Sequence, residues 1–204
     1  MNEFWNSDLT EKSWEVLCGL KRKYKFIVIG GWAAYLLSRQ QKSKDIDIVV
    51  DINELQKLKR ENLSKNDKLK KYEIKNGEID IDIYTDYYSK LTIPPEDLKN
   101  FTSKIEGFNV VIPEVLLILK QGAELDRGNS LKGQKDKLDI MAILLFCDIN
   151  FKKYKEIIKK YSLDNYIERL MFLSRDFNDY SLFNMTPKEF KSRKLKLLNE
   201  IKKI

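Results

Sequence analysis

The spacing of apolar positions changes several times over residues 8–112, which predicts a mixture of helices and short strands. Apolar residues recur at helical spacing over residues 8–23, and a second helix is predicted over residues 32–39. Between and after these helices, short apolar runs and alternating runs are typical of strands, whose side chains point to opposite faces in turn. The predicted strands cover residues 25–29, 45–50, 69–74, 78–85 and 110–112.

Turn and cap residues mark the boundaries between these elements. Gly30-Gly31 ends the first strand, and Asn76-Gly77 predicts a hairpin between two of the later strands. Asp51 is expected to cap a helix that runs to about residue 60. Residues 86–109 contain two consecutive prolines and are expected to form a loop with one short helix.

From Pro113 onward the pattern is helical throughout. Four stretches have helical periodicity, and a fifth helix begins at Thr186-Pro187-Lys188-Glu189, where a capping threonine, a proline and a glutamate occupy favoured positions. We therefore expect the chain to divide near residue 110, into an α/β half (1–110) and a helical half (111–204). The first four helical stretches read PEVLLILKQGAEL, QKDKLDIMAILLFC, FKKYKEIIKKYS and NYIERLMFLSRDF.

Composition restricts the chemistry that is open to the chain. Its 204 residues are 43% hydrophobic, which is enough for a substantial core. There is no histidine, and the two cysteines, Cys18 and Cys147, lie in apolar surroundings and are expected to be buried free thiols. Histidine-based general catalysis, Cys–His dyads and histidine-ligated zinc are thereby excluded. Acid–base or metal chemistry has to rest on carboxylates, lysines and the backbone.

The formal net charge of +7 is carried mostly by lysine. A basic surface favours polyanions such as nucleotides or nucleic acid, although a lysine-rich solvated surface gives the same composition.

No apolar run approaches the roughly 20 residues that span a bilayer. The N-terminal segment is mixed and acidic, unlike a signal peptide. We therefore expect a cytoplasmic protein without a membrane partner.

Aspartates alternate with β-branched residues in two of the predicted strands. Asp45 and Asp47 share one face of the strand over residues 45–50, and Asp80 and Asp82 share one face of the strand over residues 78–85. Neighbouring strands could bring these acids together, where they repel one another unless a cation is bound. Carboxylate ligands without histidine or cysteine favour Mg²⁺ or Mn²⁺. Alternating acid and isoleucine is also the pattern of a half-exposed strand, and this alternative stays open.

Gly30 and Gly31 change the interpretation of the first aspartate pair. A strand that turns into a helix leaves free amides at the helix N-terminus, where phosphate binds, and glycine allows a phosphate oxygen to come close to the backbone. Together with Asp45 and Asp47, the two glycines predict a triphosphate beside a bound metal. A plain tight turn is the alternative for Gly-Gly alone, and no P-loop motif follows it.

An apolar strand, Gly-Gly, a helix and then Asp-x-Asp resembles the polymerase-β-type nucleotidyltransferase superfamily. Thirteen residues separate Gly31 from Asp45, which fits the family. The resemblance implies a third acid on a later strand, for which Asp82 is the choice and Asp80 the reserve. One difference is Gly31, which stands where the family usually has serine, so that a hydroxyl is lost while the backbone amide is kept.

The helices that follow residue 113 are similar to those of the AbiEii-like branch, a group that includes toxins of toxin–antitoxin systems. In that branch a lysine of one helix and a Lys-Asp-x-x-Asp motif of the next lie near the nucleotide. Here these residues are Lys120 and then Lys135, Asp136 and Asp139. The residues alone also fit a surface pair between Lys120 and Glu124 and an ordinary polar helix face.

The resemblance implies an α+β fold: a nucleotidyltransferase-like mixed sheet flanked by helices, followed by a C-terminal helical bundle. It implies metal-dependent transfer of a nucleoside monophosphate from an NTP to a hydroxyl of RNA, protein or a small molecule, with release of pyrophosphate. Two alternatives stay open: a toxin that acts on tRNA and is countered by an antitoxin protein, and a non-catalytic nucleic-acid-binding module. The implied catalytic and metal-binding residues are Asp45, Asp47 and Asp82, with Mg²⁺ or Mn²⁺, and the implied nucleotide-binding residues are Gly30, Gly31, Lys120, Lys135 and Asp139.

Overall fold

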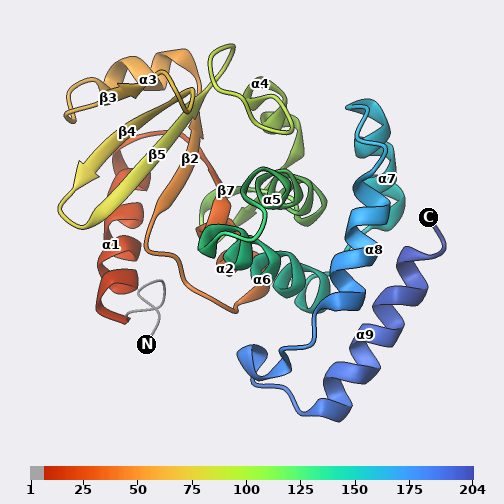
Figure 1. Cartoon of the computed structure of the whole chain (residues 1–204). Helices are drawn as coiled ribbons and strands as arrows, with labels where there is room; N and C mark the ends of the chain where they lie inside the picture. Colours follow the sequence, from red (N-terminus) through yellow and green to blue (C-terminus); the bar gives the residue numbers. More distant parts are fainter. Residues whose placement is uncertain (1–6) are drawn as a thin grey trace. The chain divides into compact units, whose positions relative to one another are not determined.

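A computed structural model describes residues 7–204. The chain divides into two compact units, Met1–Ile112 and Pro113–Ile204 (Figure 1). Residues 1–6, with which the acidic N-terminal segment begins, lie outside the described residues. Within residues 7–204, no helix combines the length and the apolar character that crossing a membrane requires.

The described part of the first unit is built around a seven-stranded mixed sheet with the strand order β3-β4-β5-β2-β1-β7-β6. The neighbours β2 and β5 run parallel, as do β1 and β7, and the other neighbouring pairs are antiparallel. The expected α+β class with a mixed sheet is confirmed. The strands are β1 (Ile27–Ile29), β2 (Ile46–Val50), β3 (Ser64–Asn66), β4 (Lys71–Asn76), β5 (Ile79–Thr85), β6 (Thr102–Ile105) and β7 (Phe108–Val111).

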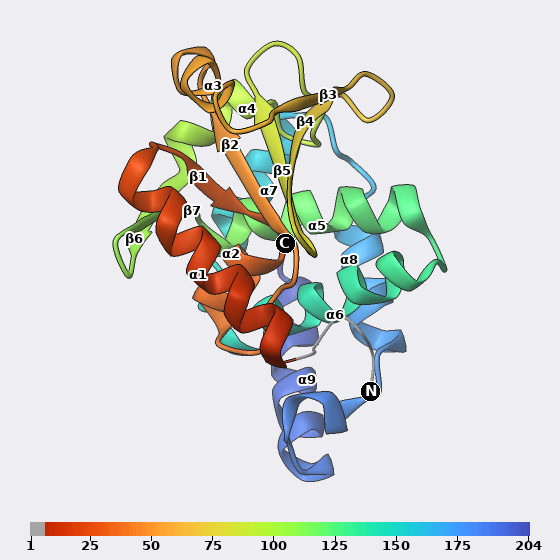
Figure 2. The ribbon, with the colours of Figure 1, turned by 90° about the vertical axis from the view of Figure 1, so that its left-hand side faces the viewer.

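Apolar side chains of the central strands form one buried face of this sheet. Val28, Ile48 and Ile83 lie opposite one another on β1, β2 and β5 and are fully buried. In Figure 2, α1 runs across the front of the sheet. It is tied to α2 by a 2.8 Å hydrogen bond that Trp32 Nε1 donates to Ser13 Oγ. The α-helices of this unit are α1 (Ser7–Lys23), α2 (Gly30–Ser38), α3 (Ile52–Leu58) and α4 (Pro95–Leu98), and a 3₁₀ helix covers Lys99–Phe101.

The predicted cap of α3 is confirmed, and the predicted hairpin is displaced by one residue. The Asp51 carboxylate accepts a 2.8 Å hydrogen bond from the amide of Glu54. In the hairpin, Asn76 is still paired with Ile79, so the two-residue loop is Gly77-Glu78 and not Asn76-Gly77. Gly77 has a φ of +62°, a backbone conformation that glycine adopts without strain.

Two strands of the sheet have no counterpart in the sequence-based prediction. β6 lies in the expected loop over residues 86–109, where it forms a hairpin with β7, and β3 pairs with β4. Both are edge strands of three or four residues, and neither contains a fully buried side chain. Such strands lack the apolar alternation on which prediction depends.

The second unit consists of helices, as predicted. α5 packs against α6, α7 and α8, and α9 packs against α6 and α8. The capping box is present: Thr186 Oγ1 accepts from the amide of Glu189 at 3.3 Å, and Glu189 Oε2 accepts from the amide of Thr186 at 3.0 Å. The helices are α5 (Pro113–Arg127), α6 (Leu131–Phe146), α7 (Phe151–Lys160), α8 (Tyr166–Asp176) and α9 (Pro187–Ile201), and a 3₁₀ helix covers Tyr180–Phe183.

Both cysteines are free thiols, one in each unit. Cys18 and Cys147 are only half-buried, which corrects the expectation of full burial. Burial nevertheless raises the pKa of Cys147 to about 12, and the nearby Glu114 carboxylate adds to the shift. That thiol is therefore protonated and a poor nucleophile at neutral pH.

Candidate functional site

Aspartates from two strands meet at the centre of the sheet. β2 and β5 are neighbours, and their register places Asp47 directly opposite Asp82. In a sheet, residues in register point to the same face. The two carboxylates therefore share the face opposite to Ile48 and Ile83, as expected if the acids of the two motifs converge.

The other two acids of these motifs occupy different surroundings. Asp45 lies in a bend directly before β2, since the strand begins one residue later than predicted, and its side chain is half-buried. Asp80 is exposed on β5, in register with Lys75. Of the two candidates for the third acid, Asp82 is therefore the one next to Asp47.

Gly30 brings the N-terminus of α2 against Asp47. Ile29, the residue before it, is in register with Asp47, and Gly30 has a φ of +64° as the first residue of the helix. A Cβ atom added at Gly30 would lie 2.1 Å from Asp47 Oδ2, so the carboxylate occupies the space that a side chain would fill.

Gly30 and Gly31 begin α2 and do not form a separate turn. The residue before them, Ile29, makes no side-chain capping hydrogen bond to this end of the helix. The first amides of a helix have no partner within it, and this end of α2, with the buried Gly31 as its second residue, lies beside Asp47.

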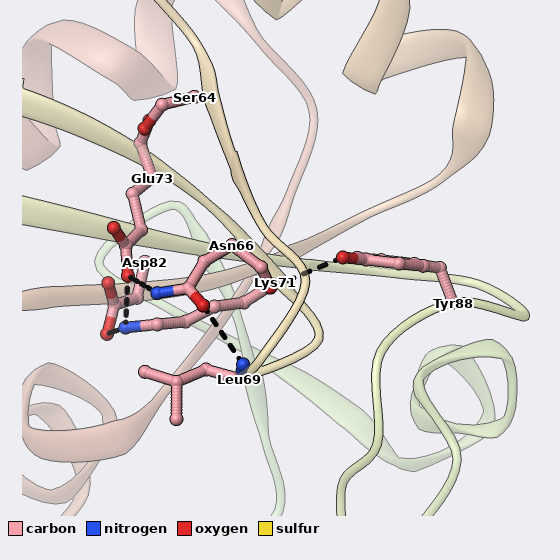
Figure 3. Close-up of polar contacts among 7 residues, drawn as sticks. All are labelled: Ser64, Asn66, Leu69, Lys71, Glu73, Asp82 and Tyr88. Carbon is pink, nitrogen blue, oxygen red and sulfur yellow. Dashed lines mark hydrogen bonds and ion pairs between the residues drawn. The ribbon is translucent and has the colours of Figure 1, made fainter.

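Lys71 of β4 forms ion pairs with two acids on the same face (Figure 3). Its Nζ lies 2.5 Å from Asp82 Oδ2 and 3.0 Å from Glu73 Oε1. Glu73 is in register with Asp82, and its Oε1 also accepts a 3.0 Å hydrogen bond from Asn66 Nδ2. Asp47, Asp82, Lys71, Glu73 and Asn66 together form what we call the Asp82 cluster.

The surroundings of Asp82 favour its neutral form. Burial raises the pKa of Asp82 to about 6, and the Asp47 carboxylate adds to the rise, while Lys71 opposes it. Burial alone would lower the pKa of Lys71, but its ion pairs with Asp82 and Glu73 outweigh this effect and raise it. Lys71 is therefore charged at neutral pH, and the two aspartates repel each other across the strand pair.

The raised pKa predicts how stability depends on pH in the absence of metal. Asp82 titrates at about 6 in the folded chain, against an ordinary value of 3.8. Its protonated form stabilises the fold fully below pH 3.8, and this contribution is lost as the pH rises through about 6. Compared with Asp82→Asn, the wild type should lose up to about 3 kcal/mol of unfolding free energy between pH 4 and pH 7. Urea unfolding of both proteins at each pH measures the difference, and parallel pH profiles would contradict it.

Sequence reasoning did not identify Lys71, Glu73 or Asn66 as site residues. The signal for two of them was present in the hairpin, because its register decides which residue of β4 faces Asp82. With the loop at Gly77-Glu78, the register places Glu73 opposite Asp82 and Lys71 two residues further along the same face. Asn66 belongs to the edge strand β3, for which the sequence has no comparable signal.

The Asp82 cluster offers a pair of carboxylates to a cation. Among residues 7–204, no group of three or more histidine, cysteine or acidic side chains is arranged to hold a metal ion. Mg²⁺, however, is commonly bound by one or two carboxylates, with substrate phosphates and water as the remaining ligands. Asp47 and Asp82 suit that arrangement, since burial and the Asp47 carboxylate raise the pKa of Asp82, and a divalent cation would relieve the repulsion between the two carboxylates.

In the helical unit, three of the predicted residues form one buried cluster. Lys120 Nζ lies 3.1 Å from Asp136 Oδ1, to which it donates a hydrogen bond, and 2.6 Å from Asp139 Oδ2, with which it forms an ion pair but no hydrogen bond. Arg127 Nη1 lies 2.8 Å from Asp136 Oδ2. Only 8% of Lys120, 1% of Asp136 and 2% of Asp139 is exposed.

The alternative surface pair between Lys120 and Glu124 is wrong. Glu124 is fully buried and forms an ion pair with Arg169 of α8. Lys135 lies half-buried on α6, one residue before Asp136. The predicted roles of Lys120, Lys135 and Asp139 in nucleotide binding stay predictions.

The buried cluster predicts a structural role for Lys120. Lys120→Met would remove the ion pairs that Lys120 makes with Asp136 and Asp139, while the half-exposed Arg127 would still pair with Asp136. We expect the unfolding free energy to fall by about 3 kcal/mol, because an uncompensated carboxylate stays buried. Lys132→Met, which removes a lysine from an exposed position on α6, is the control. Equal urea midpoints for the two variants would show that the cluster contributes little to stability.

A scan against models of protein families gives no match for this chain, and a search of curated proteins gives none either. Among solved structures, an antigenic nucleotidyltransferase-like protein from Paracoccidioides brasiliensis is 15% identical, with a TM-score of 0.42, over 89% of this chain and 99% of that one. JHP933 from Helicobacter pylori is 13% identical, with a TM-score of 0.48, over 98% of this chain and 95% of that one. Because both TM-scores lie below 0.5, we infer no function from either protein.

Proposed function

We propose that the chain is a nucleotidyltransferase, which moves a nucleoside monophosphate from an NTP to a hydroxyl acceptor and releases pyrophosphate. The observation that carries this proposal is the placement of three groups on one face of the sheet. Asp47 and Asp82 are in register on neighbouring strands, and Gly30, at the start of α2, lies against the Asp47 carboxylate. Carboxylates for a cation thus adjoin backbone amides for phosphate.

Each group has a distinct part in the proposed reaction. The acceptor hydroxyl attacks the α-phosphorus, the bond to the bridging oxygen breaks, and pyrophosphate leaves. The Gly30 and Gly31 amides stabilise charge on the triphosphate. Asp82 accepts the proton of the hydroxyl, since it lies on the same face as Asp47, on the neighbouring strand.

The proposed ligands of Mg²⁺ or Mn²⁺ are Asp47 and Asp82, together with Asp45, which has to move from its present position in the bend before β2 to join them. When bound, the cation would offset charge on the triphosphate and make the attacking hydroxyl more acidic. Lys71 now neutralises part of the charge on Asp82, so we propose that it shifts toward Glu73 or the phosphates when the cation is bound. Lys120, Lys135 and Asp139 are the proposed contributors to nucleotide binding from the helical unit.

Incubation with α-³²P-labelled NTPs, Mg²⁺ or Mn²⁺, and cellular RNA or extract tests the proposal. We expect label from at least one NTP to become attached to an acceptor, and the same NTP labelled at the γ-phosphate to release labelled pyrophosphate. Asp82→Asn should abolish both signals, while the exposed Asp80→Asn should retain them. If the protein bound NTP but transferred no label to RNA, protein or small molecules, the proposed transferase activity would be wrong, and the alternative of a non-catalytic binding module would be favoured.

The charge of the helical unit favours RNA binding as a second candidate function. Residues 113–204 contain 19 lysines and arginines against 13 acids, whereas residues 1–112 contain 19 against 18. Nearly all of the net positive charge therefore lies in the helical unit. On α9, the exposed positions Lys188, Lys191 and Lys196 present this charge to solvent.

Binding of fluorescein-labelled tRNA at increasing salt concentrations tests this candidate. A triple Lys→Gln variant at positions 188, 191 and 196 should bind more weakly and have a smaller salt slope, since each lost phosphate contact lowers that slope by about 1. Equal affinity of variant and wild type would exclude α9 as the RNA-binding surface. If expression of the protein arrests growth, and the product of a neighbouring gene relieves this arrest, the result would further support a toxin with an antitoxin partner.

A further inference from the structure

The first unit contains a pocket on the face of the sheet opposite to Asp47 and Asp82. It has a volume of about 370 Å³ and lies between α1, β4, β5 and the turn that follows α3. Ile74 and Ile81, which face each other across β4 and β5, belong to its lining. Their neighbours Glu73 and Asp82 point to the other face, so the pocket and the Asp82 cluster are separated by the sheet itself.

The pocket has an apolar floor. Leu20, Ile74 and Ile81 are each exposed by no more than 9%, and Val16 of α1 joins them in the lining. Gly19 lies among these residues on α1, and a Cβ atom added there would meet no atom within 4 Å. The absence of a side chain at Gly19 therefore keeps space open above the floor. The volume falls in the range of sites that enclose small organic ligands.

The rim of the pocket is basic. Lys23 and Arg60 line it together with one acid, Glu61. Glu61 Oε1 already accepts a 2.6 Å hydrogen bond from the Tyr24 hydroxyl and a 3.5 Å hydrogen bond from Lys23 Nζ. Arg60 forms no ion pair within the described part of the chain, and it lines the pocket beside Glu61, its neighbour in the sequence. An anionic group of a ligand would find an available guanidinium there.

We propose that this pocket binds a small organic anion that has an apolar body, such as an aromatic sulfonate or a medium-chain alkyl sulfate. The apolar body would contact Leu20, Ile74 and Ile81, and the anionic group would contact Arg60 and Lys23. An uncharged ligand would make no ion pair with the exposed Arg60 guanidinium, and a simple inorganic anion would leave the apolar floor in contact with water. The ligand class follows from this combination, and it does not depend on nucleotidyltransferase activity.

Binding of 8-anilinonaphthalene-1-sulfonate to the full chain, followed by its fluorescence, tests the proposal. We expect saturable binding at one site, competition by octyl sulfate, and weaker binding of the uncharged analogue N-phenyl-1-naphthylamine. Chemical-shift changes at the amides of Ile74 and Ile81 should accompany saturation. A complex in which these two amides are unaffected would place the dye elsewhere and overturn the proposal.

Two variants test separately what the apolar floor and the basic rim of the pocket contribute to dye binding. Gly19→Leu puts a side chain into this space, its Cβ atom meets no atom within 4 Å, and leucine is a better helix former than glycine, so the protein should fold and lose dye binding by about tenfold or more. Arg60→Glu should weaken the sulfonate by about tenfold and leave the uncharged analogue unchanged. Arg22→Glu, an exposed residue of α1 outside the pocket, makes the same change in net charge and should have no effect. Unchanged dye affinity in folded Gly19→Leu, or equal effects of both charge reversals, would overturn the proposal.

Discussion

Replacing Asp47 by asparagine should reduce nucleotide transfer by about a thousandfold, because one carboxylate of the cation-binding pair is lost. Asp47 is in register with Asp82 and lies against Gly30, so it is the acid that joins the proposed cation site to the amides that we propose bind phosphate. Asparagine has nearly the same shape, and the substitution should therefore leave the fold unchanged. Single-turnover assays with labelled NTP measure the loss.

The same substitution should stabilise the protein in the absence of metal. The Asp47 carboxylate contributes to the raised pKa of Asp82, which shows that the two charges repel each other. Removing one charge should increase the unfolding free energy by about 1 kcal/mol, or about 2–4 °C in melting temperature. Thermal melts in EDTA measure this gain. With Mg²⁺ and NTP, the order should reverse, since only the wild type is stabilised by binding.

Asp80→Asn is the matched control for both measurements. Like Asp47→Asn, it removes one negative charge, and it does so on the face of β5 that carries Asp82. Asp80, however, is exposed and lies in register with Lys75. We expect little change in transfer activity and no gain in melting temperature in EDTA. If Asp47→Asn retained wild-type transfer, the proposed assignment of the acids would be wrong. If it lost activity but gained no stability without metal, the repulsion inferred between Asp47 and Asp82 would be absent.

The sequence predicts the central elements of the fold because their side chains are strongly patterned. The apolar runs around Val28 and Ile48 are buried on one face of the sheet, and alternation in β5 separates Ile83 from the acids. Helix signals were equally direct, such as the cap at Asp51. The edge strands β3 and β6 were missed, since a strand with one neighbour and few buried side chains has no such pattern.

For the candidate site, the sequence predicts which side chains share a face of one strand, but not how the strands pair. Alternation places Asp45 and Asp47 on one face of a strand, but it does not fix which strand lies beside β2 or in which register. That information depends on long-range pairing, and a shift of one residue would move Asp82 to the other face. The ion pairs of Lys71 depend on the same pairing and were not predicted.

Charges in the helical unit show a second limit of sequence reasoning. Glu124 is four residues from Lys120, and this spacing suggests a pair on the helix surface. Glu124 instead forms ion pairs with Arg169, 45 residues away on α8, and with Lys137 of α6. Lys120 pairs with Asp136 and Asp139, which also lie on α6. Helical spacing identifies which residues can meet on one helix, but packing between helices decides which pairs form.

Replacing Gly30 by alanine should damage both the fold and the site. Gly30 has a φ of +64°, which costs a residue with a side chain about 1–2 kcal/mol. The new Cβ atom would also lie 2.1 Å from Asp47 Oδ2, so the carboxylate has to move. A displacement of about 1 Å at a reacting group can lower a rate by about a hundredfold. We expect transfer to fall by that factor, measured at a temperature where the variant is fully folded.

Gly77→Ala separates backbone strain from displacement of the carboxylate. Gly77 has a φ of +62°, but a Cβ atom added there would meet no atom within 4 Å. Both variants should therefore lose stability through strain, and only Gly30→Ala should lose transfer and affinity for Mg²⁺ with NTP. Equal activity of the two variants would mean that Asp47 can adopt a productive position without the space that Gly30 leaves, and the glycine would then serve only the turn into α2.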